Sequence, residues 1–158
     1  MIVSIDKNQL PECLDIIHKS FATVANEFGL TEENCPTHTS FMKLEKLQAY
    51  YEWGFHMFGL VHNEHIIGYF SLSSEEDTIY ELHNLSILPE YRHNGHGKIL
   101  LDYAKEKVLE WGGTRITLGI IEDSTVLKNW YSSNGFVHKG TQKFDHLPFT
   151  AGFMEWNC

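Results

Sequence analysis

The sequence has few of the features that mark membrane, secreted or nucleic-acid-binding proteins. It contains no run of about 18 apolar residues, so we expect no transmembrane helix. The N-terminal Met1-IVSID reaches the acidic Asp6 without the apolar core of a signal peptide. Only 12 lysines and arginines stand against 21 aspartates and glutamates, and the formal charge of −9 argues against a nucleic-acid partner. We therefore expect a cytoplasmic protein that binds neither membranes nor nucleic acids.

Cysteine is also scarce, and its spacing excludes two common uses. Cys13, Cys35 and Cys158 are odd in number, far apart and without a C-x-x-C pair, so neither a disulfide framework nor a zinc knuckle is expected. His62 and His65 are close together, but no third cysteine or histidine lies nearby. We interpret these histidines as parts of a solvated hairpin turn and predict reduced thiols and no metal.

What the chain does contain is an ordinary globular composition. Its 158 residues are 42% hydrophobic and 21% charged, which suits one domain, residues 1–158, with a substantial core. No internal repeat or low-complexity segment divides the chain. We therefore expect one domain and no second one.

Periodicity and turn residues predict the order β-α-α-β-β-β-α-β-α-β-β. The expected strands are Met1–Ile5, Phe55–Val61, Ile66–Leu72, Thr78–Leu88, Arg115–Ile121, Phe136–Gln142 and Phe149–Trp156, with a turn at Glu75–Asp77. The expected helices run from an Asn8 cap to Phe28, from Phe41 to Tyr51, from Ile99 to Trp111, and from an Asp123 or Ser124 cap to Tyr131. A run of hairpins followed by strand-helix-strand predicts an α/β fold with a mixed, mostly antiparallel sheet and helices on both faces.

One stretch, Glu81 to Lys98, organises the rest of the chain. An apolar strand stops at Pro89, and the helical pattern begins at Ile99. Between them lies Arg92-His-Asn-Gly95-His-Gly97-Lys98, which we call the phosphate turn. A glycine turn that opens a helix presents unpaired backbone N–H groups at the positive end of the helix dipole, so it is suited to bind a phosphate.

Two common phosphate-binding motifs do not fit this turn. The dinucleotide pattern G-x-G-x-x-G fails because Leu100 stands at the third glycine position. The P-loop fails because Arg92 replaces its first glycine and Ile99 replaces its serine or threonine. What remains is Arg-x-x-Gly-x-Gly between a strand and a helix.

This pattern resembles the GNAT family of acyl-coenzyme A N-acyltransferases. The segment Leu85-Ser-Ile-Leu-Pro89-Glu-Tyr-Arg92 is similar to the strand and turn of that family, and Trp130-Tyr131-Ser-Ser-Asn-Gly135-Phe136 is similar to its second landmark. The predicted order of elements resembles the GNAT fold over almost the whole chain. The resemblance therefore implies a GNAT-like fold that binds acetyl-coenzyme A.

The resemblance also assigns the cofactor contacts. It implies that the pyrophosphate is held by the backbone N–H groups of His93, Asn94, Gly95, His96, Gly97 and Lys98, with charge added by Arg92 and Lys98. It implies a bulged, splayed strand before the turn, whose backbone at Leu85 and Ile87 pairs with the pantetheine arm. The Leu85 N–H would also face the thioester oxygen, on which negative charge grows during attack.

Three side chains are candidates for acid–base chemistry. Glu81 and His83 are two apart on one strand, so both point to the same side, and either can accept the proton that an amine nucleophile loses. Tyr131 matches the family tyrosine that faces the coenzyme A sulfur and protonates the departing thiolate. Ser124 and Leu127 share its helix face but stand where the family usually has Asn and Ala. These two residues imply side-chain contacts with the pantetheine that differ from those usual in the family.

Two functions of different classes remain open. One is an N-acetyltransferase that moves the acetyl group of acetyl-coenzyme A to a primary amine of a small molecule or peptide, directly in a ternary complex. The other is an acyl-coenzyme A-binding sensor without turnover. Tyr131, Glu81 and His83 favour the enzyme, whereas Ser124 and Leu127 favour the sensor. The net charge favours a cationic acceptor, and the sequence is compatible with a homodimer.

Overall fold

The computed structural model describes all residues, 1–158. Its strands are β1 (Ile2–Ser4), β2 (His56–His62), β3 (His65–Glu76), β4 (Ile79–Ile87), β5 (Arg115–Ile121), β6 (Val137–Lys143) and β7 (Thr150–Asn157). Its helices are α1 (Leu10–Phe28), α2 (Leu44–Glu52), α3 (His96–Glu110) and α4 (Thr125–Ser133), with short 3₁₀ turns η1 (Lys7–Gln9), η2 (Thr39–Phe41) and η3 (Pro89–Tyr91). The predicted order of helices and strands is confirmed.

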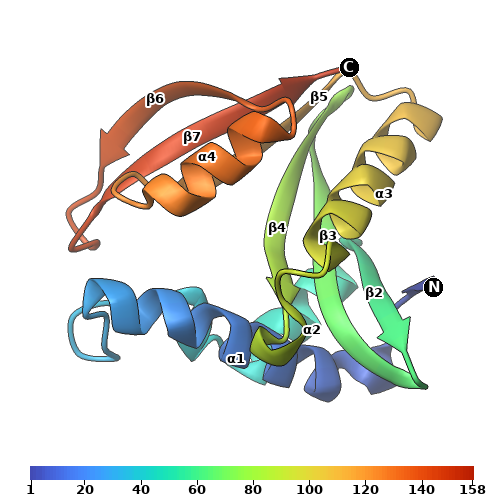
Figure 1. Ribbon diagram of the computed structural model, residues 1–158, viewed down its shortest axis with the longest axis horizontal. Helices are drawn as coiled ribbons and strands as arrows, with labels where there is room; N and C mark the ends of the chain where they lie inside the picture. The colour runs from blue at the N-terminus through green and yellow to red at the C-terminus, as the bar shows by residue number, and fades with distance from the viewer.

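The seven strands form one sheet in the order β1-β2-β3-β4-β5-β7-β6. All neighbouring strands are antiparallel except β4 and β5, which are parallel because α3 connects them. This is the mixed, mostly antiparallel sheet that the sequence predicts. This order places β5, β7 and β6 beyond β4, with α4 on the side of the sheet that α3 also covers (Figure 1).

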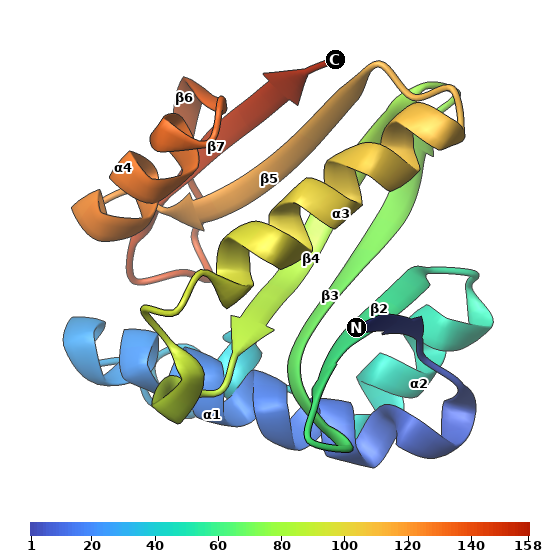
Figure 2. The ribbon, with the colours of Figure 1, turned by 45° about the vertical axis from the view of Figure 1, so that its right-hand side comes forward.

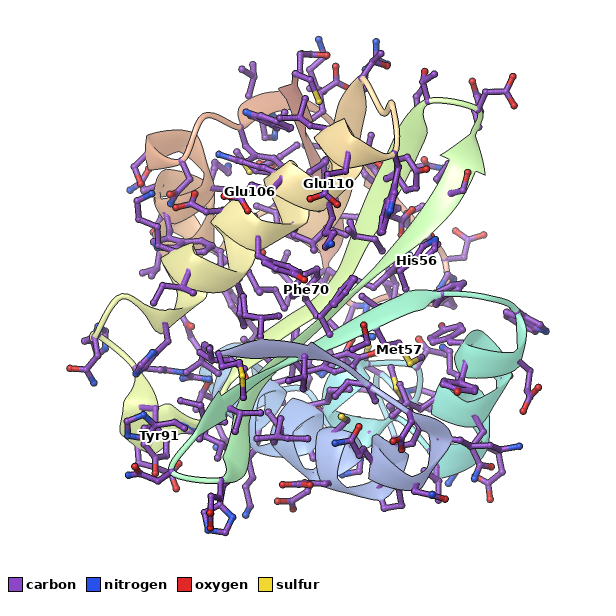
Figure 3. All side chains as sticks on the ribbon, turned by 90° about the vertical axis from the view of Figure 1, so that its right-hand side faces the viewer. His56, Met57, Phe70, Tyr91, Glu106 and Glu110 are labelled. Carbon is purple, nitrogen blue, oxygen red and sulfur yellow. The ribbon has the colours of Figure 1, made fainter.

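Helices cover both faces of the sheet, and each face has its own core. Phe70 of β3 packs in the core that α3 and α4 cover, where Leu101 and Tyr131 are also buried. Met57 of β2 belongs to the core under α1 and α2, with Ile17 and Leu47. Figure 3 shows Phe70 and Met57 on opposite sides of the central strands.

The sheet opens between β4 and β5. These strands pair only from Ile79 to Glu81 on β4, against Arg115 to Thr117 on β5, and then diverge (Figure 2). On its other edge, β4 carries a bulge: Ser71 of β3 pairs with His83 and Tyr69 with Ser86, so three steps along β4 match two along β3. Asn84 at the bulge has a φ of 55°. The bulge and the splay that the family resemblance implies are both present.

Some predicted boundaries were wrong for local reasons. Asn8 does not cap α1; Asp6 caps η1, where its side chain accepts from the Asn8 N–H, and Gln9 completes a capping box. Glu75 does not lie in a turn. It belongs to β3, which extends to Glu76 and turns only at Asp77.

Two expectations about composition can be compared with the structure. All three cysteines are free, as predicted, with Cys13 and Cys35 buried and Cys158 exposed. No helix in the structure combines the length and the apolar character that a bilayer crossing requires.

Candidate active site

A cavity of about 660 Å³ fills the gap between the diverging strands. Its walls come from β4 and β5, from the phosphate turn, from α4, and from the C-terminal half of α1. Of the residues proposed from the sequence, Leu85, Ile87, Arg92, His93, Gly95, His96, Gly97, Lys98, Ser124, Leu127 and Tyr131 line it. Elements far apart in the sequence therefore converge on one space.

The phosphate turn supplies the polar end of this cavity. Gly95 sits at the N-cap of α3 with a φ of 82°, which favours glycine, and no side chain caps the helix. From His93 to Lys98, no backbone N–H donates a hydrogen bond to another group of the protein. Six consecutive unpaired donors at a helix N-terminus are suited to bind an anion. Asn94 is exposed and donates from its side chain to the Arg92 carbonyl at 3.1 Å.

The two cations of the turn have protein partners. The Arg92 guanidinium donates to the Ser20 carbonyl at 2.7 Å and to the Thr23 hydroxyl at 3.0 Å, both on α1. Burial lowers the pKa of Arg92, but a guanidinium remains charged in proteins. Lys98 bonds Asp102 at 2.8 Å on the exposed surface of α3. Arg92 thus connects the phosphate turn to α1, which the sequence did not indicate.

Tyr131 forms part of the opposite wall. It is 8% exposed, its ring packs edge-on against Phe136 at 5.4 Å, and it lines the cavity with Leu127 one turn earlier and Ser124 two turns earlier. Burial raises the pKa of its phenol, so the hydroxyl stays protonated at neutral pH. The cavity therefore holds a neutral proton donor.

Glu81 and His83 lie together but not on this wall. Glu81 Oε2 is 3.1 Å from His83 Nδ1. Glu81 lines a second hollow of about 250 Å³, and Leu118 and Gly119 of β5 line both spaces. His83 is only 20% exposed and stacks on Phe55 at 5.0 Å.

Burial decides the charge state of this pair. It raises the pKa of Glu81, with a smaller contribution from the Glu75 carboxylate, and it lowers the pKa of His83 to about 4. The imidazole is therefore neutral at pH 7, and its 3.1 Å contact with Glu81 is not an ion pair. A neutral imidazole beside a carboxyl group with a raised pKa can accept a proton.

Glu75, Glu81 and His83 also form the one group whose potential ligand atoms lie within 4.8 Å of one another. His83 Nε2 is hydrogen-bonded with the Ser73 hydroxyl at 2.7 Å, and Nδ1 lies 3.1 Å from Glu81 Oε2. His62 and His65 pair across the β2–β3 turn, as the hairpin interpretation predicts.

Several lining residues were missed by sequence reasoning. Asn84, at the bulge of β4, lines the cavity. Trp130 also lines it and lies against Gly97. Trp130 was within the second motif, so its position next to Tyr131 was an available signal. The contribution of Ser20 and Thr23 depends on a contact between α1 and the distant Arg92, for which the sequence has no local signal.

Comparison with known proteins identifies the family. The sequence model of the Acetyltransferase (GNAT) family matches residues 24–136, more than half of the chain. The chain belongs to the GNAT family. The match includes β2 to β5, the phosphate turn and the whole of α4, and it confirms the resemblance inferred from the two motifs.

Relatives and solved structures agree with this assignment. An uncharacterized N-acetyltransferase of Mycobacterium tuberculosis is 30% identical over 83 residues, covering 52% of this chain; the match spans about half the length of that relative, 53%. PaiA N-acetyltransferase from Thermoplasma acidophilum, solved with coenzyme A, has a TM-score of 0.77 at 20% identity and covers 100% of this chain and 98% of its own. The ribosomal-protein-S18-alanine N-acetyltransferase of Escherichia coli has a TM-score of 0.80 at 16% identity and covers 99% and 92%. These structural likenesses show the GNAT fold.

Proposed function

We propose that this protein transfers the acetyl group of acetyl-coenzyme A to a primary amine of a small molecule or peptide. The observation that carries the proposal is the row of unpaired N–H groups from His93 to Lys98, which opens onto the same cavity as Tyr131. A pyrophosphate at the row leaves the rest of the cavity for pantetheine and thioester. Coenzyme A complexes of proteins with this fold support the cofactor assignment.

We propose that the pantetheine arm binds along β4, where this strand diverges from β5. Beyond Glu81, β4 has no pairing with β5, and Leu85 has no partner in the β3 register, so its backbone groups are available to a ligand. The Leu85 N–H would stabilise the negative charge that develops on the thioester oxygen. Ile87 would extend the same backbone edge towards the phosphate turn.

We propose direct transfer in a ternary complex, because the cavity holds no thiol that could carry the acetyl group. None of the three cysteines lines it, and burial raises the pKa of Cys13 to about 12. The amine would therefore attack the thioester itself. The tetrahedral intermediate then collapses with loss of the coenzyme A thiolate.

The proposed proton donor and proton acceptor lie on different elements: Tyr131 on α4 and Glu81 on β4. Tyr131, on α4, would protonate the departing thiolate. Glu81, on the hollow that adjoins the cavity at Leu118 and Gly119, would take the amine proton through water, with His83 Nδ1 at 3.1 Å from its carboxyl group. These roles, rather than a sensor without turnover, account for a neutral phenol inside the cofactor cavity.

The acceptor is proposed to be cationic. Glu27 of α1 adds a carboxylate to the lining of the cavity, to which Arg92 and Lys98 contribute the positive charges of the phosphate turn. The net charge of −9 also attracts cations over the whole surface.

The test is coenzyme A thiol release over a panel of amines that includes polyamines, peptides with basic first residues and acidic amino acids. We expect faster turnover with basic acceptors, and the preference should shrink as salt screens the charges. Glu27→Gln should reduce the preference, whereas Glu106→Gln, a change on α3 outside the cavity, should not. Faster turnover with an acidic acceptor than with every basic one would contradict the acceptor class.

A further inference from the structure

The side chain of Arg92 leaves the phosphate turn and binds α1 at three points. Its Nη2 donates to the Ser20 carbonyl at 2.7 Å and to the Ser20 hydroxyl at 3.1 Å, and its Nη1 donates to the Thr23 hydroxyl at 3.0 Å. The Thr23 hydroxyl itself donates to the Ser20 carbonyl at 2.8 Å. These three residues therefore form one closed hydrogen-bonded group between the turn and the helix.

The Arg92 guanidinium keeps donors and a charge that no protein group uses. Of its five N–H groups, three take part in these bonds, and Nε makes no hydrogen bond with the protein. No ion pair of the protein includes Arg92. A half-buried cation without a countercharge favours an anion nearby, and the row of unpaired N–H groups begins at the next residue, His93.

The face of α1 that Arg92 binds is also the face that lines the cavity. Ser20, Thr23 and Glu27 recur at i, i+3 and i+7, which places them along one side of the helix, and all three line the cavity. Glu27 is exposed, and no ion pair of the protein includes it. The bonds of Arg92 therefore fix the rotation of α1 that presents this free carboxylate to the cavity.

Apolar packing holds the two halves of α1 unequally. From Leu10 to Ile17 the helix is buried in the core that α2 also covers. After Ser20, Ala25 is the one buried residue of the helix, in a cluster of four buried residues that includes Ile121 of β5. Figure 1 shows this C-terminal half of α1 continuing past β4 to the side of β6 and β7. The bonds of Arg92 thus add a polar attachment where apolar packing is sparse.

We propose that Arg92 is a positioning residue that couples the two ends of the cavity: it holds the α1 face bearing Glu27, and it holds that face more firmly when acetyl-coenzyme A occupies the phosphate turn. The pyrophosphate supplies the missing countercharge, and the free Nε–H can face it while the bonds to Ser20 and Thr23 persist. By linkage, an acceptor that binds the held position of α1 strengthens cofactor binding by the same factor. The inference rests on the proposed function, because it takes acetyl-coenzyme A and a cationic amine as the two ligands.

Hydrogen–deuterium exchange of the backbone amides tests the coupling without turnover, with saturating coenzyme A as the probe. We expect coenzyme A to slow exchange from Ser20 to Phe28 about threefold or more, and to leave Leu10 to Ile17 unchanged. Unchanged exchange along all of α1 would overturn the proposal. Faster exchange from Ser20 to Phe28 would also overturn it, because Arg92 would then leave α1 when the cofactor binds.

Two variants interrupt the contact from its two sides. Arg92→Lys retains the charge but replaces the planar fork by one ammonium group, which cannot hold Ser20 and Thr23 together. The double variant Ser20→Ala/Thr23→Val removes both hydroxyl partners and leaves Arg92 in place. Each should remove most of the slowing by coenzyme A, whereas Thr141→Val, an exposed threonine of β6 outside the cavity, should not. Slowing as large as in the wild type in both variants would overturn the proposal.

Turnover tests the consequence for the acceptor, with the basic amine of the panel that reacts fastest. Ser20→Ala/Thr23→Val should raise the KM for this amine about five- to tenfold with little change in kcat, whereas Thr23→Ser should retain the KM because it keeps a hydroxyl. In a Glu27→Gln background the double variant should have no further effect. A fall in kcat at unchanged KM, or fully additive effects with Glu27→Gln, would show that the contact does not position Glu27.

Coenzyme A binding and acetyl transfer separate this proposal from the proposed function. If coenzyme A protects the amides from His93 to Lys98 but not those of α1, the coupling is refuted and the cofactor site stands. If α1 is protected but no amine is acetylated, the proposed function is refuted and the coupling stands.

Discussion

A Cβ atom on Gly97 would lie 3.2 Å from Cζ2 of Trp130, so the phosphate turn and the second motif meet in space. The contact joins the first turn of α3 to α4, across the cavity that separates β4 from β5. Glycine is thus favoured at position 97 by a close neighbour, whereas at position 95 it is favoured by the positive φ of the backbone.

We expect Gly97→Ala to destabilise the protein by about 1 kcal/mol or more, because Trp130 must move from a close-packed position. Chemical denaturation measures the change. In a Trp130→Phe background the same substitution should cost less, since the smaller ring leaves room, and a double-mutant cycle gives the difference. Equal costs in the two backgrounds would show that the contact is not the cause.

Gly95→Val should abolish the stabilisation of the fold by acetyl-coenzyme A. A Cβ atom at this position has no protein atom within 4 Å, but it would stand among the unpaired N–H groups where the pyrophosphate is proposed to bind. Gly112→Val is the matched control: Gly112 has a φ of 78° and open space around it, at the other end of α3. Both variants should lose stability through the strained backbone, but only Gly112→Val should retain the thermal shift with acetyl-coenzyme A. A retained shift in Gly95→Val would refute the phosphate site.

Tyr131→Phe should lower kcat by about 10²–10⁴-fold with little change in acetyl-coenzyme A affinity, because the ring still packs and only the acid is lost. The raised pKa of this buried phenol keeps it protonated into the alkaline range, so it should produce no alkaline limb near neutral pH. Tyr80→Phe removes another buried phenol, outside the cavity, and serves as the control. Full kcat in Tyr131→Phe, with chemistry rate-limiting, would mean that the phenol only packs.

The buried imidazole of His83 should make stability fall with pH on the acid side. Its pKa is about 4 in the folded protein and near 6.5 when unfolded, so between these values the unfolded chain binds the extra proton. The stabilisation is present above pH about 6.5 and is lost as pH falls through about 4, up to about 3 kcal/mol. The raised pKa of Glu81 acts in the opposite sense. Denaturation of Glu81→Gln with and without His83→Gln therefore isolates the imidazole, and parallel pH curves would contradict the assignment.

The sequence was sufficient for the fold and for the phosphate turn, because both depend on local patterns. Periodicity marks the helices and strands, and the glycines at 95 and 97 mark a turn whose conformation is set within a few residues. The helix face that carries Ser124, Leu127 and Tyr131 was predictable for the same reason, and all three side chains line the cavity.

What the sequence could not supply depends on pairing between distant segments. The partners of His83 follow from the register of β3 against β4, which the bulge at Asn84 shifts by one residue. The glutamate at position 75 was assigned to a turn, because acidic runs are typical of turns, although it continues β3. The binding of Arg92 to α1 joins segments about 70 residues apart, and only tertiary packing brings them together.

The central claim is that acetyl-coenzyme A gives its acetyl group directly to an amine in this cavity. The most direct measurement follows acetylated amine by mass spectrometry and free coenzyme A by thiol titration in the same reaction, with a panel of amines. We predict one acetylated amine for each coenzyme A released, no release without amine, and no acetylated protein intermediate. Coenzyme A release without any acetylated amine, or an acetylated side chain formed before the amine is added and consumed by it, would contradict the account.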